Sequence, residues 1–335
     1  MSDRHDDYPF DLVQKDFSER PEEARNLLRR RPFVRFLDTL EEGANHFAPG
    51  DRLEDAVNTA LAVGSPLLMT GQAGTGKTQA AYWAARRLGL GEVLHFQVKS
   101  TSTARDLLYT FDTVRYFHDA NIQDAELASR RRYLEPGMLW RAIDPGVDSE
   151  EEEDSNRRTA APSGPRLLLI DEIDKAPRDF PNDLLHELNQ MRFTVPEVPE
   201  LGEVRQNDKG LRPVVMITSN NERQLPEPFL RRCVYHHIVL DADLVQRAVA
   251  ARRGELEALS DEFLDLALRR FLDLRALHLR KPPSTGEYLV WLRVLALRVS
   301  GAPEKLQGDL AHLPYLSVLI KNRQDLQRLG AAEDV

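Results

Sequence analysis

The sequence feature that most constrains this chain is the segment GQAGTGKT at residues 71–78, which fits the pattern G-x-x-x-x-G-K-[ST]. Its glycines allow backbone N–H groups to turn inward around phosphate oxygens. The apolar run Pro66 to Thr70 precedes it and a helical pattern follows, so the segment is expected to join a strand to a helix. We expect Lys77 to neutralise the β and γ phosphates of a nucleotide and the Thr78 hydroxyl to bind Mg²⁺. The predicted phosphate-binding residues are Gly71, Gln72, Ala73, Gly74, Thr75, Gly76, Lys77 and Thr78.

Further apolar, strand-like runs occur at Val93 to Val98, Arg166 to Ile170 and Val214 to Thr218. Nearly continuous apolar strands that alternate with helices predict an α/β fold, with a parallel sheet flanked by helices and ligands at the carboxyl ends of the strands. The helix after the glycine loop is expected to end at Gly89 or Gly91. From about residue 243 the pattern is helical throughout.

The predicted organisation has three parts: an N-terminal helical extension over residues 1–44, a nucleotide-binding domain over 45–242 and a helical domain over 243–335. Residues 143–165 combine carboxylates with Pro, Gly and Ser and predict a flexible acidic insertion. Residues 195–213 predict an exposed loop or hairpin, with a turn at Asp208 to Gly210.

Composition narrows the class of protein. The chain has 335 residues, of which 41% are hydrophobic, so it is long enough to bury its own core. The lone cysteine, Cys233, excludes an internal disulfide framework and argues against a zinc site. The acidic start without an apolar secretory core, and the lack of a long apolar run, predict a cytoplasmic protein without a membrane span. The net charge of −9 disfavours nucleic acid as a partner, although short arginine clusters occur.

The second chemical signal is LLLIDEIDKAP at residues 167–177, an apolar strand that ends in two adjacent carboxylates. Beside a phosphate loop, Asp171 is expected to hold the Mg²⁺ shell, and Glu172 to orient and deprotonate the attacking water. Asp174 and Lys175 are interpreted as solvated charges at a helix start, with contact to the site or to a neighbouring subunit as the alternative.

The third signal is VVMITSNNERQLPEPFLRRC at residues 214–233. Asn220 follows an apolar strand, where its amide is suited to contact both the lytic water and the γ phosphate. Arg231 and Arg232 close a short helical segment, and a guanidinium there is suited to neutralise charge on a γ phosphate.

The ordered set of GQAGTGKT, LLLIDEID, TSN and LPEPFLRRC, followed by a helical tail, resembles the AAA+ ATPases and, within them, the MoxR-like branch. This resemblance, over about residues 45 to 300, implies an AAA+ core with a helical lid, using ATP and Mg²⁺. It also implies a ring, usually a hexamer, in which one subunit supplies an arginine finger to the next; Arg232 matches that position better than Arg231. The family packs adenine near Phe47 to Pro49.

One departure from the family pattern lies in the lid, where Ser284, Thr285 and Gly286 occupy the neighbourhood of the usual sensor-two arginine. The segment at residues 99–120 resembles a helix-two region that carries an insertion in this branch. Its aromatic residues are interpreted as a buried stripe, with a partner-facing or pore-facing role as the alternative; they are Tyr109, Phe111, Tyr116 and Phe117.

The resemblance implies a chaperone-like ATPase that remodels a separate partner protein, in this branch commonly one with a von Willebrand factor A domain. The low lysine fraction of the chain favours a bacterial genome of high GC content. Three alternatives stay open. One is a regulatory nucleotide switch of a bacterial conflict or defence system, the second a nucleic-acid motor or loader, and the third a scaffold that binds ATP without hydrolysing it. The intact Glu172 disfavours the scaffold, and salt-sensitive binding of DNA or RNA would favour the motor.

Overall fold

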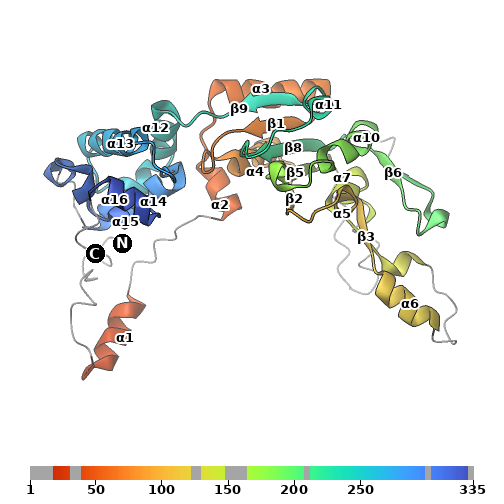
Figure 1. The fold of residues 1–335 in the computed structure, drawn as a ribbon, viewed down its shortest axis with the longest axis horizontal. Coiled ribbons are helices and arrows are strands. Elements are labelled where there is room, and N and C mark those ends of the chain that lie inside the picture. Colours follow the sequence, from red (N-terminus) through yellow and green to blue (C-terminus); the bar gives the residue numbers. More distant parts are fainter. Residues whose placement is uncertain are drawn as a thin grey trace. The chain divides into compact units, whose positions relative to one another are not determined.

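The computed structural model of the chain describes residues 18–30, 39–121, 130–147, 164–206, 212–298 and 303–330. Contacts divide the chain into two compact units, one spanning residues 40–240 and the other combining residues 1–39 with 241–335 (Figure 1). Most of the predicted acidic insertion, residues 148–163, lies outside the described residues. Among the described helices, none has both the length and the apolar character that a membrane crossing requires.

The larger unit is built on a parallel sheet with the strand order β2-β5-β8-β1-β9. Alternate residues of its central strands enter two different cores: Leu67 and Met69 pack toward α3 and α4, whereas Leu68 packs with α7 on the opposite face. The predicted α/β fold with a doubly covered parallel sheet is therefore confirmed. The strands are β1 (Leu67–Thr70), β2 (Leu94–Gln97), β5 (Leu167–Asp171), β8 (Val214–Ser219) and β9 (Val234–His237).

Helices α3 (Asp51–Val63) and α4 (Lys77–Leu88) cover one face of this sheet, and α2 (Leu40–Asn45) packs on α4. Four alanines of α4 are buried, and their small side chains allow the helix to approach the strands closely. The helix ends at Gly89, which adopts the left-handed conformation with φ 67° and donates its N–H to the Ala85 and Arg86 carbonyls, as predicted.

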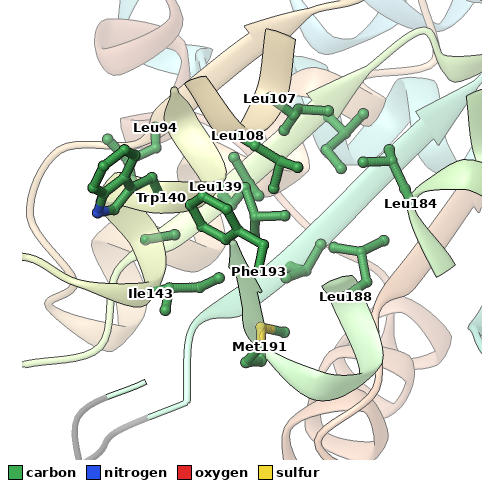
Figure 2. Close-up of a cluster of buried hydrophobic side chains, with 14 of the residues drawn as sticks. Leu94, Leu107, Leu108, Leu139, Trp140, Ile143, Leu184, Leu188, Met191 and Phe193 are labelled. Carbon is green, nitrogen blue, oxygen red and sulfur yellow. The ribbon is translucent and has the colours of Figure 1, made fainter. Parts of the chain in front are cut away.

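The opposite face carries the larger core, which Figure 2 shows around Leu139, Trp140 and Phe193. Trp140 and Phe193 meet edge to face, with ring centroids 5.4 Å apart. Elements that cover this face are α5 (Ala104–Leu108), α7 (Met138–Ile143), α9 (Phe180–Asp183), α10 (Leu185–Gln190) and α11 (Glu227–Leu230), with the 3-10 helix η3 (Ile173–Lys175).

Between α5 and α7, strands β3 (Tyr109–Phe111) and β4 (Leu134–Pro136) pair antiparallel and flank helix α6 (Thr113–Asn121) and η2 (Arg130–Tyr133). The interpretation of the aromatic residues of the segment at 99–120 as a buried stripe is wrong in part. Tyr109 is buried, but Phe117 is 59% exposed. Within the small insertion the Tyr116 ring packs edge to face against Tyr133, with centroids 5.5 Å apart, and Phe117, which contacts Tyr116, is left at the surface.

A second hairpin, β6 (Arg192–Thr194) and β7 (Glu203–Arg205), lies partly upstream of the predicted loop at 195–213 and carries η4 (Pro199–Leu201). The prediction that the whole segment is exposed is wrong, since Val195 and Val198 are 2% and 1% exposed and join the larger core. The predicted turn at Asp208 to Gly210 lies outside the described residues.

The smaller unit is helical, as predicted for this region. Its core gathers Phe271, Tyr288 and Trp291, and the Trp291 indole donates to the Pro314 carbonyl at 2.7 Å. Its elements are α1 (Pro21–Arg29), α12 (Ala242–Ala250), η5 (Arg253–Leu256), α13 (Asp261–Ala276), α14 (Thr285–Arg298), η6 (Pro303–Leu306), η7 (Leu310–His312), α15 (Leu316–Leu319) and α16 (Arg323–Arg328).

Candidate functional site

The glycine loop between β1 and α4 requires glycine at two positions, because of positive φ angles and close contacts there. Gly71 has φ 148°, and a Cβ atom there would lie 2.5 Å from the Ile238 carbonyl oxygen, just after the edge strand β9. Gly76 has φ 87°, and a Cβ there would lie 3.0 Å from the Phe47 ring. The loop is therefore fitted closely between β9 and the segment that precedes α3.

Lys77, the first residue of α4, is 6% exposed and turns back toward the loop. Its Nζ donates to the carbonyls of Gly71 and Gln72, each at 2.9 Å. Burial lowers the pKa of Lys77, although Asp171 and two neighbouring carboxylates act in the opposite direction. The ammonium is thus kept at the mouth of the loop, where phosphate oxygens would replace its carbonyl partners.

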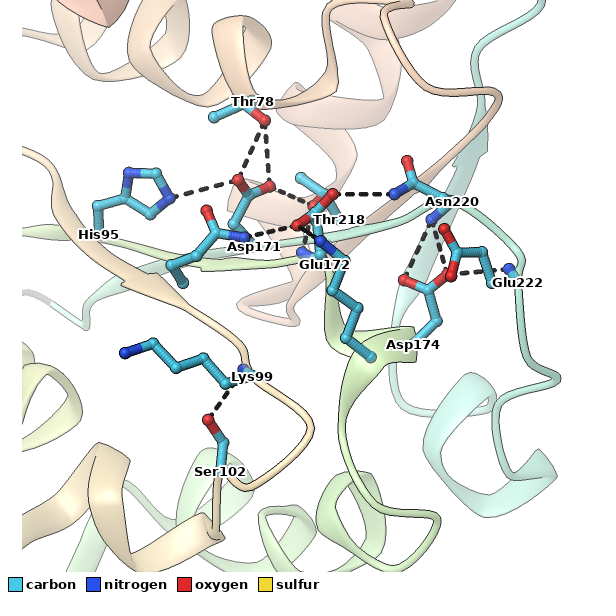
Figure 3. Close-up of polar contacts among 12 residues, drawn as sticks. Thr78, His95, Lys99, Ser102, Asp171, Glu172, Asp174, Thr218, Asn220 and Glu222 are labelled. Carbon is cyan, nitrogen blue, oxygen red and sulfur yellow. Dashed lines mark hydrogen bonds and ion pairs between the residues drawn. The ribbon is translucent and has the colours of Figure 1, made fainter. Parts of the chain in front are cut away.

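Thr78 and Asp171 face each other across the end of the sheet (Figure 3). The Thr78 hydroxyl donates to both Asp171 carboxylate oxygens, at 3.1 and 3.2 Å. The Thr218 hydroxyl donates to Asp171 as well, and His95 Nε2 lies 3.3 Å from its Oδ2. Burial alone would raise the pKa of Asp171, but the contacts with His95, Thr218 and Thr78 outweigh it and hold that pKa below its ordinary value.

Glu172 stands in the left-handed conformation, with φ 59° and ψ 49°, which a non-glycine residue rarely adopts. Gln97 Nε2 donates to its carboxylate at 2.7 Å, and Lys175 forms a short ion pair with it. Its backbone N–H donates to the Thr218 hydroxyl at 2.8 Å. Strained backbone of this kind is characteristic of functional sites, because the surrounding structure must hold it.

Asn220, one residue after β8, is brought against Glu172: its Nδ2 donates to the Glu172 Oε1 at 3.1 Å. The interpretation of Asp174 as a solvated charge is wrong. Asp174 is 3% exposed, and its carboxylate accepts the backbone N–H groups of Asn220 and Glu222. The strand ends of β5 and β8 are therefore joined by side chains as well as by the sheet.

The arginine pair after α11 is exposed. Arg231 pairs with Glu227 in the same short helix, and Arg232 Nη1 donates to the Pro228 carbonyl at 3.3 Å. Among the described residues, neither guanidinium forms a hydrogen bond or ion pair with Glu172 or Asn220. Hydrogen bonds thus join the predicted loop, carboxylate and amide residues, and the two arginines instead contact their own helix.

His95, Gln97 and Thr218 carried no prediction of a site role, and for Asp174 and Lys175 a place in the site was only the alternative to a solvated charge. His95 and Gln97 alternate along β2 and lie beside Leu169 and Asp171 of β5. The sequence did contain a signal for His95 and Gln97. Both are polar residues at alternate positions of an otherwise apolar strand.

The donor set suits Mg²⁺. Thr78 and Asp171 offer only oxygen atoms, and Mg²⁺ takes one or two protein oxygens together with waters and substrate phosphates. Over the residues that the structure describes, no cluster of three or more His, Cys, Asp or Glu is arranged to hold an ion by itself. The site therefore fits a metal ion that arrives with a phosphate ligand.

Comparison with known proteins gives one family. The sequence model described as AAA domain (dynein-related subfamily) matches residues 66–233. No curated protein matches the chain.

Several solved structures are similar at low identity. A candidate ATPase from Cytophaga hutchinsonii ATCC 33406 has 12% identity and a TM-score of 0.35, and the match covers 95% of this chain and 99% of that one. A DNA replication initiation factor has 16% identity and a TM-score of 0.39, with 79% and 66% covered. NtrX from Brucella abortus, in complex with ADP, has 14% identity and a TM-score of 0.38, with 93% and 64% covered.

Proposed function

This chain belongs to the AAA domain family, in the dynein-related subfamily, and we propose that it binds ATP with Mg²⁺ and hydrolyses the bond to the terminal phosphate. The observation that carries the proposal is the meeting of Lys77, the Thr78–Asp171 pair and the Glu172–Asn220 pair at the carboxyl edge of one parallel sheet. Ligands of open parallel sheets bind at that edge.

Each group has a defined task in this proposal. The inward-facing amides of the glycine loop bind phosphate oxygens, and Lys77 exchanges its two carbonyl partners for the phosphates. Thr78 and Asp171 hold Mg²⁺, which when bound supplies positive charge beside the phosphates. Because Asp171 keeps a lowered pKa, it remains the anionic ligand that this role needs.

Glu172 orients the attacking water and accepts its proton, and Asn220 holds the Glu172 carboxylate in place through its amide. Gln97 and Lys175 contact one oxygen of this carboxylate and Asn220 contacts the other, so an acceptor position remains for the attacking water. Its left-handed backbone aims the side chain across the strand end toward Asn220.

We further propose that the chain is of the MoxR-like branch and works as a ring, with six subunits as the expected number. The segment LPEPFLRR supports the branch. Arg231 and Arg232 are exposed and contact only their own short helix among the interactions described above, which supports action on the ATP of a neighbouring subunit, with Arg232 as the finger. In this proposal residues 45–242 form the nucleotide domain and residues 243–335 the lid, and their movement remodels a separate partner protein.

Replacing Glu172 with Gln tests the hydrolysis. The amide keeps the shape of the side chain but cannot accept a proton, so turnover should fall by about 100-fold or more while ATP still binds. The matched control is Glu200→Gln, at an exposed glutamate of η4. ATPase assays and binding of a fluorescent ATP analogue report the two properties separately; undiminished turnover in Glu172→Gln would refute the assigned role.

A further inference from the structure

One buried carboxylate has no task in the proposed hydrolysis. Asp174 lies in η3, two residues after Glu172, and is 3% exposed. An ionised carboxylate is costly to bury unless hydrogen-bond donors surround it. Its partners therefore indicate what it stabilises.

Those partners are all backbone groups of the loop that follows β8. The Asn220 N–H lies 3.2 and 3.1 Å from the two Asp174 oxygens, and the Glu222 N–H donates to Oδ2 at 2.9 Å. Between them, Asn221 is in the left-handed conformation, with φ 60°. Figure 3 shows the carboxylate beneath this loop. A loop with strained backbone at its centre needs such external donors and acceptors to keep one conformation.

A second contact joins the same two segments. Arg223 Nη1 donates to the Ala176 carbonyl at 3.3 Å. The turn at residues 173–176 therefore holds the loop at Asn220, at Glu222 and at Arg223. Because the Asn220 backbone is fixed, its side-chain amide is also fixed, 3.1 Å from the Glu172 carboxylate.

We propose that Asp174 is a positioning residue which, by binding the backbone of the Asn220–Glu222 loop, aims the Asn220 amide at Glu172. The inference rests on the proposed hydrolysis and adds to it a residue that touches neither the nucleotide nor the water. Asp174 acts only through Asn220, so its removal should matter only while the Asn220 amide is present.

A double-mutant cycle tests this dependence. Asp174→Ala should lower kcat by about 10- to 100-fold with little change in KM, since misplacing a group that orients the reaction costs about this much. Asp174→Asn keeps one acceptor oxygen and should recover part of the loss, and it preserves the test if the alanine variant folds poorly. In an Asn220→Ala background, Asp174→Ala should change kcat by less than about twofold. Asp179→Asn, at an exposed position of the next turn, is the matched control.

Multiplicative losses in the double variant would overturn the proposal. They would indicate instead that Asp174 acts by its charge on Lys77 or by general stability. Equal turnover in wild type and Asp174→Ala would also overturn it.

Hydrogen–deuterium exchange tests the loop without using turnover. In Asp174→Ala, the amides of Asn220 and Glu222 should exchange about tenfold faster than in Asp179→Asn, because two buried acceptors are lost. Unchanged exchange there would overturn the role of Asp174 in holding the loop. If the wild type hydrolyses no ATP, the proposed function fails, and so does the proposal that the Asn220 amide is positioned for catalysis by Glu172. The exchange result then still decides whether Asp174 holds the loop.

Discussion

Asp171 is fixed by side chains from three separate elements: Thr78 of α4, Thr218 of β8 and His95 of β2. His95 is itself held, because its Nδ1 lies 3.1 Å from the hydroxyl of Tyr82, one helical turn after Thr78. A carboxylate with this many partners has a single orientation. Residues that orient a metal ligand commonly affect metal binding nearly as much as the ligand does.

In His95→Phe, Asp171 should lose one of the partners that fix its orientation, so Mg²⁺ should bind more weakly. An aromatic ring stays at this position, but both ring nitrogens and their contacts to Asp171 and Tyr82 are lost, so the Mg²⁺ concentration for half-maximal ATPase should rise by about tenfold. A Mg²⁺ titration at fixed ATP measures this. His186→Phe, at an exposed histidine of α10, is the matched control. A titration curve unchanged from wild type would mean that Thr78 and Thr218 orient Asp171 without His95.

The left-handed backbone of Glu172 predicts that two variants, both without activity, differ in stability. Glycine adopts φ 59° without strain, whereas alanine does not, and both remove the carboxylate. Glu172→Gly should therefore be more stable than Glu172→Ala by about 1 kcal/mol, and neither should hydrolyse ATP. Chemical denaturation of the two variants gives the difference. Equal stabilities would show that the backbone relaxes when the side chain is removed.

At the scale of elements, the sequence was most informative where one physical rule dominates. The parallel strands β1, β5 and β8 were predictable because continuous apolar runs end in polar residues. The exposure of residues 195–213 was misjudged because each strand of the β6–β7 hairpin has only three residues, too few for an alternation to show which side chains are buried. Asp174 was misjudged because its burial depends on backbone donors 46 and 48 residues away, which no local pattern records.

The contact between the glycine loop and edge strand β9 gives an element-scale prediction. In Gly71→Ala the new methyl group would meet the Ile238 carbonyl, so the loop should shift, with a cost of about 2 kcal/mol or more in unfolding free energy. Nucleotide binding should weaken with it. Gly89→Ala is the matched control, since Gly89 also has positive φ but has no atoms within 4 Å of a new Cβ.

Unfolding curves and nucleotide titrations of the two variants separate the strain of positive φ from the collision with Ile238. Gly89→Ala should lose about 1 kcal/mol of stability and keep its nucleotide affinity. If both variants bound nucleotide as wild type does, the fit of the loop against β9 would have no part in binding.

At the scale of the whole molecule, the proposed ring assigns part of each site to a neighbouring chain. The carboxylates and the amide are gathered at one strand edge, and Arg231 and Arg232 are exposed. A head-to-tail ring would supply one subunit's arginine to the next, because every interface in such a ring is the same heterologous contact. Activity should then rise with protein concentration as rings form.

Mixing two inactive variants tests that arrangement directly. Arg232→Ala subunits keep Glu172, and Glu172→Gln subunits keep Arg232, so an Arg232→Ala site next to a Glu172→Gln neighbour has both groups. In a random equal mixture, about a quarter of the interfaces have this pairing, and the mixture should regain about a quarter of wild-type turnover. Replacing Arg231 instead of Arg232 in the mixture identifies which guanidinium acts. A mixture no more active than its separate components, although mass measurements show mixed rings, would mean that the arginine does not complete a neighbour's site.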